Sequence, residues 1–367
     1  MQWLTKVKAT MPVSQAYCLL QQPDGGLVVG KPNGNGELPL PRFLLNGLCA
    51  WPMPNDKSSM HSQYAGLTHQ HFAQLLDAAH RAFPGLNCIR LRVDAGYYNR
   101  LNPDQKRLYV QRLIGDCKQA ADSGMYCLIC CWDSLDDGAK WLERYQDSFG
   151  MFRDIHAAVL EDPILRTHVL YEPFNEPNNV RAPHWLECMK QVVIFFRQTL
   201  GYRYALFINT FFWSHGHDEE AMVALENTDR VMLANLVGRS WALLDHGICF
   251  CNHVYANHLS IFPGYRWKDQ YWINANGGPQ SKRAKCVTEV GFYNFVPERK
   301  SINEAWSEKS MAFFARRALN VPFYSGVIRF NGLWGDPNGL FTLDDSGGQV
   351  SFVPTQWCLI AAAAARP

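Results

Sequence analysis

The segment YEPFNEPNN, residues 171–179, contains two glutamates, Glu172 and Glu176, directly after an apolar run. Glu176 also precedes a proline, which restricts its backbone and makes a regular helix or strand there unfavourable. A further glutamate, Glu289, lies inside the apolar run AKCVTEVGF at residues 284–292. Carboxyl groups can act as general acids, general bases or nucleophiles when a fold brings two of them together. The chemistry therefore depends on the elements that position these glutamates.

Eight short apolar runs are typical of strands and recur roughly every 40 residues, the length of a strand with its return helix. The runs are residues 43–49, 86–93, 125–131, 167–173, 204–210, 247–255, 284–292 and 326–334. Segments with helical periodicity separate several of them: 67–83, 103–124, 183–201 and 307–320, with 354–365 as the last helix. Strands alternating with helices predict a parallel sheet, and eight such units predict a closed (β/α)8 TIM barrel of the α/β class.

The ends of the chain and its connections complete this expectation. Residues 17–45 are rich in turn residues and predict a β-hairpin region, so we assign 1–42 to an N-terminal extension and 43–367 to the barrel. The connection 256–283 lacks an amphipathic pattern and is expected to be a long loop. No linker or low-complexity segment divides the chain, which predicts a single domain, residues 1–367.

Composition excludes several classes of function. The net charge of +2 favours neither nucleic acid nor a membrane surface as partner, and we expect a monomer. The N-terminal residues 1–14 contain no apolar stretch typical of a signal peptide. Secretion after removal of such a signal, a cytoplasmic location and a virion-associated location all remain open. The 12 Trp, 15 Tyr and 21 Phe residues suit a core and also sugar-stacking surfaces.

The twelve cysteines are best interpreted as buried free thiols, because many lie inside apolar runs. Cys127 and Cys130 are three residues apart on a strand and face opposite sides, so they cannot form one redox pair or metal site. Cys249, Cys251 and His253 share a face, where small packing residues are more consistent with the pattern than a metal site. No glycine-rich phosphate loop and no HExxH motif is present, so we expect no cofactor and no metal.

The carboxyl ends of barrel strands open onto one mouth, where TIM-barrel enzymes place their catalytic groups. Glu176 follows the fourth predicted strand and Glu289 ends the seventh. NEP after strand four, together with TEVGF on strand seven, resembles the clan A glycoside hydrolases. Within that clan the chain most resembles glycoside hydrolase family 5, which contains many cellulases and β-mannanases. The resemblance covers roughly residues 25–350.

Three further elements occur in the order typical of that family. GLNCIRLRV resembles its strand-two arginine element and points to Arg90, although Arg92 on the same strand is an alternative. CNHVY resembles the strand-six element and points to His253 and Tyr255, and FNGLW points to Trp334. Many members end strand three with histidine, where this chain has Trp132, so a usual polar contact with sugar is absent.

The resemblance implies a retaining double displacement with Glu176 as general acid/base and Glu289 as nucleophile. Asn175 would bind the sugar 2-hydroxyl, and Arg90 beside Glu289 would keep it ionised. Glu172 has the same strand parity as Glu176 and lies deeper, which suits a hydrogen-bonded structural acid.

The other implied roles concern orientation and sugar stacking. Tyr255 would orient the nucleophile, His253 would belong to the network around the two carboxylates, and Trp334 would be a sugar platform. Three other tryptophans follow strand ends and suit either core packing or a subsite: Trp51, Trp132 and Trp213.

The sequence therefore predicts a hydrolase of β-linked polysaccharides or oligosaccharides, of endo-β-1,4-glucanase (cellulase) type. A β-mannanase, another β-glucan hydrolase and a transglycosylase are alternatives with the same two glutamates. A non-catalytic carbohydrate-binding barrel is the alternative from a different class.

Overall fold

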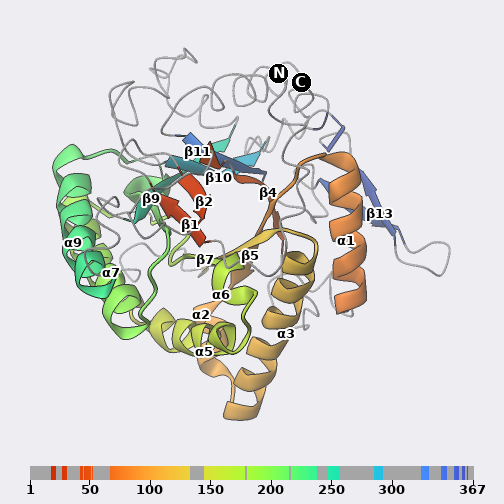
Figure 1. Cartoon of the computed structure of the whole chain (residues 1–367), viewed down its shortest axis with the longest axis horizontal. Helices are drawn as coiled ribbons and strands as arrows, with labels where there is room; N and C mark the ends of the chain where they lie inside the picture. Colours follow the sequence, from red (N-terminus) through yellow and green to blue (C-terminus); the bar gives the residue numbers. More distant parts are fainter. Residues whose placement is uncertain are drawn as a thin grey trace, which may run out of the picture.

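The computed structural model describes residues 18–21, 27–30, 42–43, 45–50, 52, 67–132, 144–177, 180–214, 216–237, 247–255, 285–291, 324–329, 340–344, 351–354, 358–359 and 362. Eight parallel strands form a closed barrel in the order β10-β11-β4-β5-β6-β7-β8-β9 (Figure 1). They are β4 (Leu45–Ala50), β5 (Cys88–Val93), β6 (Tyr126–Cys131), β7 (Val169–Glu172), β8 (Leu206–Asn209), β9 (Ile248–Tyr255), β10 (Lys285–Gly291) and β11 (Tyr324–Arg329). Each predicted run contributes one strand, which confirms the (β/α)8 barrel.

Five long helices lie in an arc along one side of the barrel, from α9 and α7 through α5 and α3 to α1 (Figure 1). They are α1 (His69–Ala82), α3 (Pro103–Asp122), α5 (Asp147–Glu161), α7 (Ala182–Ile194) and α9 (Glu219–Val237). Shorter pieces are α2 (Ala95–Arg100), α6 (Leu165–His168), α8 (Phe211–Ser214) and a π-helical turn, η3 (Phe195–Thr199). The helices predicted at 67–83, 103–124 and 183–201 are confirmed, the last ending in η3. The helices α5 and α9 were not predicted.

Other predicted elements are described only in part. The helix expected at 307–320 and the loop expected at 256–283 lie outside the described residues. Of the last expected helix, 354–365, the structure describes 354, 358–359 and 362: 358–359 and 362 are helical, whereas Pro354 ends a strand, so the prediction was wrong at that residue.

Local signals in the sequence explain the bounds of α3. The Asn102 side chain accepts from the backbone N–H of Gln105 at 2.9 Å, and the Gln105 side chain accepts from that of Asn102 at 3.0 Å. This reciprocal pair satisfies two N–H groups that have no partner within the helix, and Pro103 suits the first helical position. After the helix, Gly124 adopts a φ of 77°, which glycine tolerates better than other residues.

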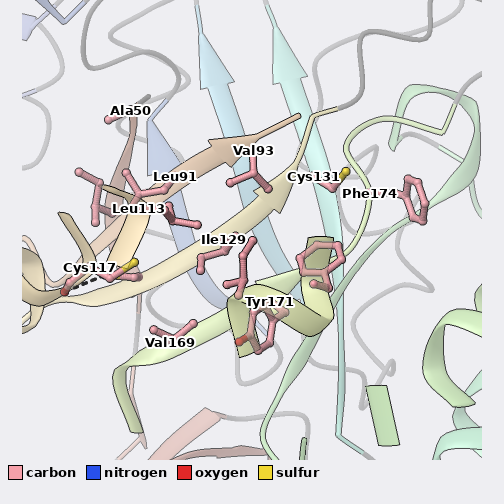
Figure 2. Close-up of a cluster of buried hydrophobic side chains, with 14 of the residues drawn as sticks. Ala50, Leu91, Val93, Leu113, Cys117, Ile129, Cys131, Val169, Tyr171 and Phe174 are labelled. Atoms are coloured by element: carbon pink, nitrogen blue, oxygen red, sulfur yellow. Dashed lines mark hydrogen bonds between the residues drawn. The ribbon is translucent and has the colours of Figure 1, made fainter. Parts of the chain in front are cut away.

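Alternation along the strands divides the core into two layers. Outward-facing side chains such as Leu91, Ile129 and Tyr171 are fully buried and belong to the layer that includes Leu113 and Cys117 of α3 (Figure 2). Burial of each large apolar side chain stabilises the fold by about 1.5–3 kcal/mol.

Inward-facing residues fill the barrel itself. They form a separate cluster: Leu45, Cys49, Cys88, Tyr126, Leu128, Leu170, Ala205, Phe207, Cys249, Cys251 and Cys286. The eleven cysteines whose side chains are described are all buried and free, which confirms the free-thiol prediction for them. Cys127 faces outward and contacts the backbone carbonyl of Cys117 at 3.5 Å, whereas Cys130 faces inward toward Arg90.

Two small antiparallel sheets flank the barrel. β1 (Cys18–Gln21), β2 (Leu27–Gly30) and β3 (Arg42–Phe43) form the N-terminal sheet, which confirms the predicted hairpin region. β1 contacts α6, which lies directly before β7, so this sheet lies toward the end of the barrel opposite the mouth. β12 (Phe341–Asp344) pairs with β13 (Ser351–Pro354), which contacts α1. Within the described ranges, no helix has the length and apolar character needed to cross a membrane.

Candidate active site

Five of the predicted site residues meet at the mouth of the barrel. They come from β5, β9, β10 and the turn after β7, and hydrogen bonds and one ion-pair contact connect them: Arg90, Asn175, Glu176, His253 and Glu289. Arg90, His253 and Glu289 have no exposed surface, whereas the Glu176 side chain is 17% exposed. The site therefore has a buried floor and one carboxyl group that reaches solvent.

Arg90 connects the elements of this floor. Its Nη1 donates to Glu289 Oε1 at 2.5 Å, and its Nη2 donates to Asn175 Oδ1 at 2.7 Å. Its Nε and Nη2 also donate to the two oxygens of Glu172, at 2.5 and 2.7 Å. Burial alone would lower the pKa of Arg90, but the neighbouring Cys130 and the two carboxylates raise that pKa above its ordinary value. A permanent cation therefore lies beside Glu289.

Glu172 is a buried structural acid, as its strand parity predicted. It has no exposed surface and accepts from Arg90 and from the side chain of Asn209. β7 ends at Glu172, directly before Pro173, which cannot donate to a neighbouring strand. The chain then turns, and the backbone N–H of Asn175 donates to the Cys131 carbonyl at 2.9 Å. This turn places Asn175 and the next residue at the mouth.

Glu176 occupies an unusual backbone conformation. Its φ is 39°, in the left-handed region that few residues other than glycine adopt. Strained positions of this kind cluster at functional sites, where surrounding contacts hold them in place. One such contact is the hydrogen bond between Glu176 Oε1 and His253 Nδ1, at 2.6 Å.

A register shift in β10 directs Glu289 into the barrel. Cys286 pairs with Cys251 and Glu289 pairs with His253, so three steps along β10 match two steps along β9. The additional residue is Thr288, whose hydroxyl lies 3.1 Å from His253 Nε2. Regular alternation from the inward-facing Cys286 would turn Glu289 outward. With the shift, Glu289 Oε2 lies 3.4 Å from His253 Nδ1.

His253 therefore lies between the two candidate catalytic carboxylates. Ligand atoms of Glu176, His253 and Glu289 all lie within 4.8 Å of one another, a spacing that could also hold a metal ion. Burial raises the pKa of Glu176, His253 lowers it in part, and the Glu289 carboxylate raises it, leaving a pKa above the ordinary value. A carboxyl group with a raised pKa stays protonated at higher pH and can act as a proton donor.

The tryptophan and tyrosine predictions are only partly described. The Trp132 ring is half-buried and lies over the Arg92 guanidinium, 3.9 Å from ring centroid to Cζ. Arg92 is thus the partner of an aromatic ring, while Arg90 contacts the carboxylates. The backbone of Tyr255 ends β9 and that of Trp213 lies in α8, but their side chains lie outside the described residues. Trp51 and Trp334 lie outside them entirely.

Three residues that contribute to the site were not identified from the sequence: Cys49, Cys130 and Thr288. Cys130 Sγ lies 2.9 Å from Arg90 Nη2 and Cys49 Sγ lies 3.5 Å from Arg90 Nη1, and the Cys49 thiol contacts the Thr288 carbonyl at 3.7 Å. Burial raises the pKa of both thiols, so they remain neutral. Strand parity would have placed Cys130 inward, but the contact with Thr288 depends on the register shift.

Comparisons with known proteins agree with this architecture. No family model and no curated protein matches the sequence. Among solved structures, the fold is similar to the cellulase Cel5C_n, with a TM-score of 0.60 and 17% identity over 98% of this chain and 95% of that chain. It is also similar to the catalytic domain of the Thermobifida fusca endoglucanase Cel5A, with a TM-score of 0.55 and 16% identity over 89% and 92% of the two chains.

A third similar structure is a mannanase catalytic domain from Streptomyces sp. SirexAA-E, with a TM-score of 0.54 and 14% identity over 95% and 90% of the two chains. All three likenesses extend over most of both chains, at identities that show the fold alone. The resemblance to glycoside hydrolase family 5 is therefore confirmed at the level of the fold: this chain is a (β/α)8 barrel built like the cellulase, the endoglucanase and the mannanase domain.

Proposed function

We propose that this protein is a retaining β-glycoside hydrolase acting on a β-linked polysaccharide or oligosaccharide, of endo-β-1,4-glucanase type. One observation carries the proposal: a ligand oxygen of Glu176 and one of Glu289 lie within 4.8 Å of each other at the barrel mouth. Retaining glycosidases hold their two carboxyl groups about 5–5.5 Å apart, whereas inverting enzymes need about 6.5–9.5 Å to admit a water molecule. The short separation supports direct attack by a carboxylate.

In the first step, protonated Glu176 would donate its proton to the leaving glycosidic oxygen while Glu289 attacks the anomeric carbon. Glu289 Oε1 accepts from Arg90 at 2.5 Å, and we assign Oε2 as the attacking oxygen. The product of this step is a covalent glycosyl-enzyme. In the second step, ionised Glu176 would remove a proton from water, which then attacks the anomeric carbon and releases the sugar with retained configuration.

Asn175 has a geometry suited to its proposed contact with substrate. Its Oδ1 accepts from Arg90 Nη2, which fixes the amide orientation. The Nδ2 group then faces away from the cation and can donate to the sugar 2-hydroxyl. Trp132 is the described aromatic ring at the mouth that could stack on a sugar, since its ring is half-buried.

The test compares wild type with Glu289→Gln and Glu176→Gln on soluble β-glucans, mannans and xylans, with sizing of the products. Loss of nucleophile should abolish hydrolysis while sugar binding persists, and loss of the acid should lower kcat by about 10²–10⁴-fold. Glu161→Gln, at an exposed position of α5, is the matched control. Proton NMR of the first product should show the anomer of the substrate linkage.

Mannan is the second candidate substrate, because a mannanase catalytic domain is among the similar structures. Longer products at high substrate concentration would instead assign a transglycosylase. If no glycan is cleaved and Glu289→Gln binds sugar like wild type, the protein is a non-catalytic carbohydrate-binding barrel.

A further inference from the structure

We infer that Glu176, His253 and Glu289 also form a binding site for a divalent transition-metal ion such as Zn²⁺, and that the bound ion keeps sugar from the two carboxylates. This inference concerns binding and does not depend on the proposed hydrolysis. Among the described residues, these three form the one group of His, Cys, Asp or Glu side chains whose ligand atoms lie close enough to share an ion.

One distance between ligand atoms already suits a small ion with nitrogen and oxygen ligands, and a second would have to lengthen. Zinc bonds of about 2.0–2.2 Å in a tetrahedral arrangement place two ligand atoms about 3.4 Å apart. His253 Nδ1 and Glu289 Oε2 are separated by 3.4 Å. His253 Nδ1 and Glu176 Oε1 are 2.6 Å apart, joined by a hydrogen bond. Entry of the ion would release the proton of that bond, and Glu176 would move outward by about 1 Å or less. Because its side chain is 17% exposed, Glu176 has the room to do so.

The surrounding groups support the same ligand atoms. Metal-binding histidines usually donate their second ring N–H to a neighbouring group, which fixes the tautomer. His253 Nε2 lies 3.1 Å from the Thr288 hydroxyl, and donation there leaves the Nδ1 lone pair for the ion. Glu289 Oε1 accepts from Arg90 at 2.5 Å, and Oε2 is the Glu289 oxygen that lies 3.4 Å from His253 Nδ1. The fourth coordination position would be open to water, as in zinc sites with three protein ligands.

The positive charge of Arg90 repels a cation, but the Glu172 carboxylate neutralises that charge. Glu172 accepts from Arg90 Nε and Nη2, so this pair is neutral and the carboxylates of Glu176 and Glu289 supply the charge for the ion. One imidazole and two carboxylates favour zinc, copper or nickel over magnesium and calcium, which prefer all-oxygen sites. The thiols that could compete for such ions are buried wherever the structure describes them.

Calorimetric titration of the full chain with ZnCl2, beside MgCl2, tests the inference. One Zn²⁺ per chain should bind, EDTA should reverse binding, and saturating Mg²⁺ should not compete. His253→Asn and Glu176→Gln should each weaken Zn²⁺ binding by about tenfold or more. His184→Asn, at an exposed position of α7, is the matched control and should bind like wild type. Circular dichroism tests whether each variant is folded. If His253→Asn is unfolded, the titration of Glu176→Gln alone decides the inference.

Two results overturn the inference: absence of Zn²⁺ binding by wild type, or wild-type affinity in a folded His253→Asn or Glu176→Gln variant. Because calorimetry measures binding directly, a protein that hydrolyses no glycan still gives a decisive answer. In a protein that does hydrolyse glycans, Zn²⁺ should inhibit competitively with substrate, and non-competitive inhibition would place the ion elsewhere.

Discussion

Replacing Glu172 and Glu176 by glutamine, one at a time, should distinguish a residue that stabilises the fold from one that takes part in the reaction. Both oxygens of Glu172 accept from Arg90, at 2.5 and 2.7 Å, and neither residue of this pair has exposed surface. Glutamine keeps the shape but removes the charge and directs an N–H group at the guanidinium. Removing one partner of a buried ion pair destabilises proteins by about 3–5 kcal/mol, because the other charge stays buried.

This free energy converts into a measurable shift of the melting temperature for Glu172→Gln. Unfolding entropy near the midpoint is about 2.1 cal/mol/K per residue, so a 367-residue chain that unfolds cooperatively should lose about 4–6 °C in Tm. Activity should also fall, because Glu172 fixes the guanidinium that contacts Asn175 and Glu289.

Glu176→Gln should leave the melting temperature unchanged or higher while it lowers kcat. The raised pKa of Glu176 means that its contribution to stability is fully present below its unfolded pKa of about 4.5 and is lost as pH rises through the folded pKa. Glutamine cannot ionise and avoids that loss, and its amide oxygen can still accept from His253. The variant should therefore match wild-type Tm near pH 4 and equal or exceed it at pH 7, while kcat falls by about 10²–10⁴-fold.

Differential scanning calorimetry between about pH 4 and pH 7, with initial rates on the best substrate, measures both effects. Glu161→Gln on the surface of α5 controls for a generic loss of charge. A Glu172→Gln variant with wild-type Tm would refute the stabilising role of the buried pair. An active Glu176→Gln variant would refute the assignment of the acid.

Three further predictions concern the surroundings of the site. His253→Asn should move the alkaline limb of the kcat/KM profile to higher pH, because His253 lowers the pKa of Glu176 and its removal raises it further; an unmoved limb contradicts this. Cys49→Ala removes the thiol that contacts Arg90 at 3.5 Å and should lower kcat by about two- to tenfold, with Cys49→Ser restoring it, and equal losses in both variants would argue for packing alone. Asp229→Asn breaks the fully buried contact with Arg197 at 2.7 Å and should lower stability by about 3–5 kcal/mol in denaturant unfolding without changing KM; a changed KM would contradict a purely structural role.

The barrel was predictable because each strand carries its own signal. The run 125–131 is apolar on both faces, as expected for a strand buried between a filled barrel and a helical layer. The run 86–93 keeps an apolar outer face, whereas Arg90 and Arg92 lie on its inner face. Helices with strong local signals, such as α3 with its capping pair and terminal glycine, were equally accessible. The helices α5 and α9 were not identified, although both carry buried apolar residues and α9 has a start signal, since the Asp218 side chain accepts from the Ala221 backbone N–H at 2.9 Å.

The site was predictable in composition but not in geometry. Motif order identified Arg90, Asn175, Glu176 and His253, and the side-chain contacts then followed from the closure of the barrel. The positive φ of Glu176 could not be read from its residue type, because glutamate rarely adopts it. Tertiary contacts after β7 impose it.

Glu289 shows the limit of periodicity most clearly. From the inward-facing Cys286, a period of two residues predicts that Thr288 faces the barrel interior and Glu289 the helices. In the structure, β10 has one additional residue relative to β9 at this point, so that the Thr288 hydroxyl and the Glu289 carboxylate both lie close to His253. Such an irregularity costs regular strand pairing at the mouth, and it is stable here because Arg90 holds the carboxylate at 2.5 Å. The position of the proposed nucleophile is therefore determined by a contact between residues 199 positions apart, which no local pattern encodes.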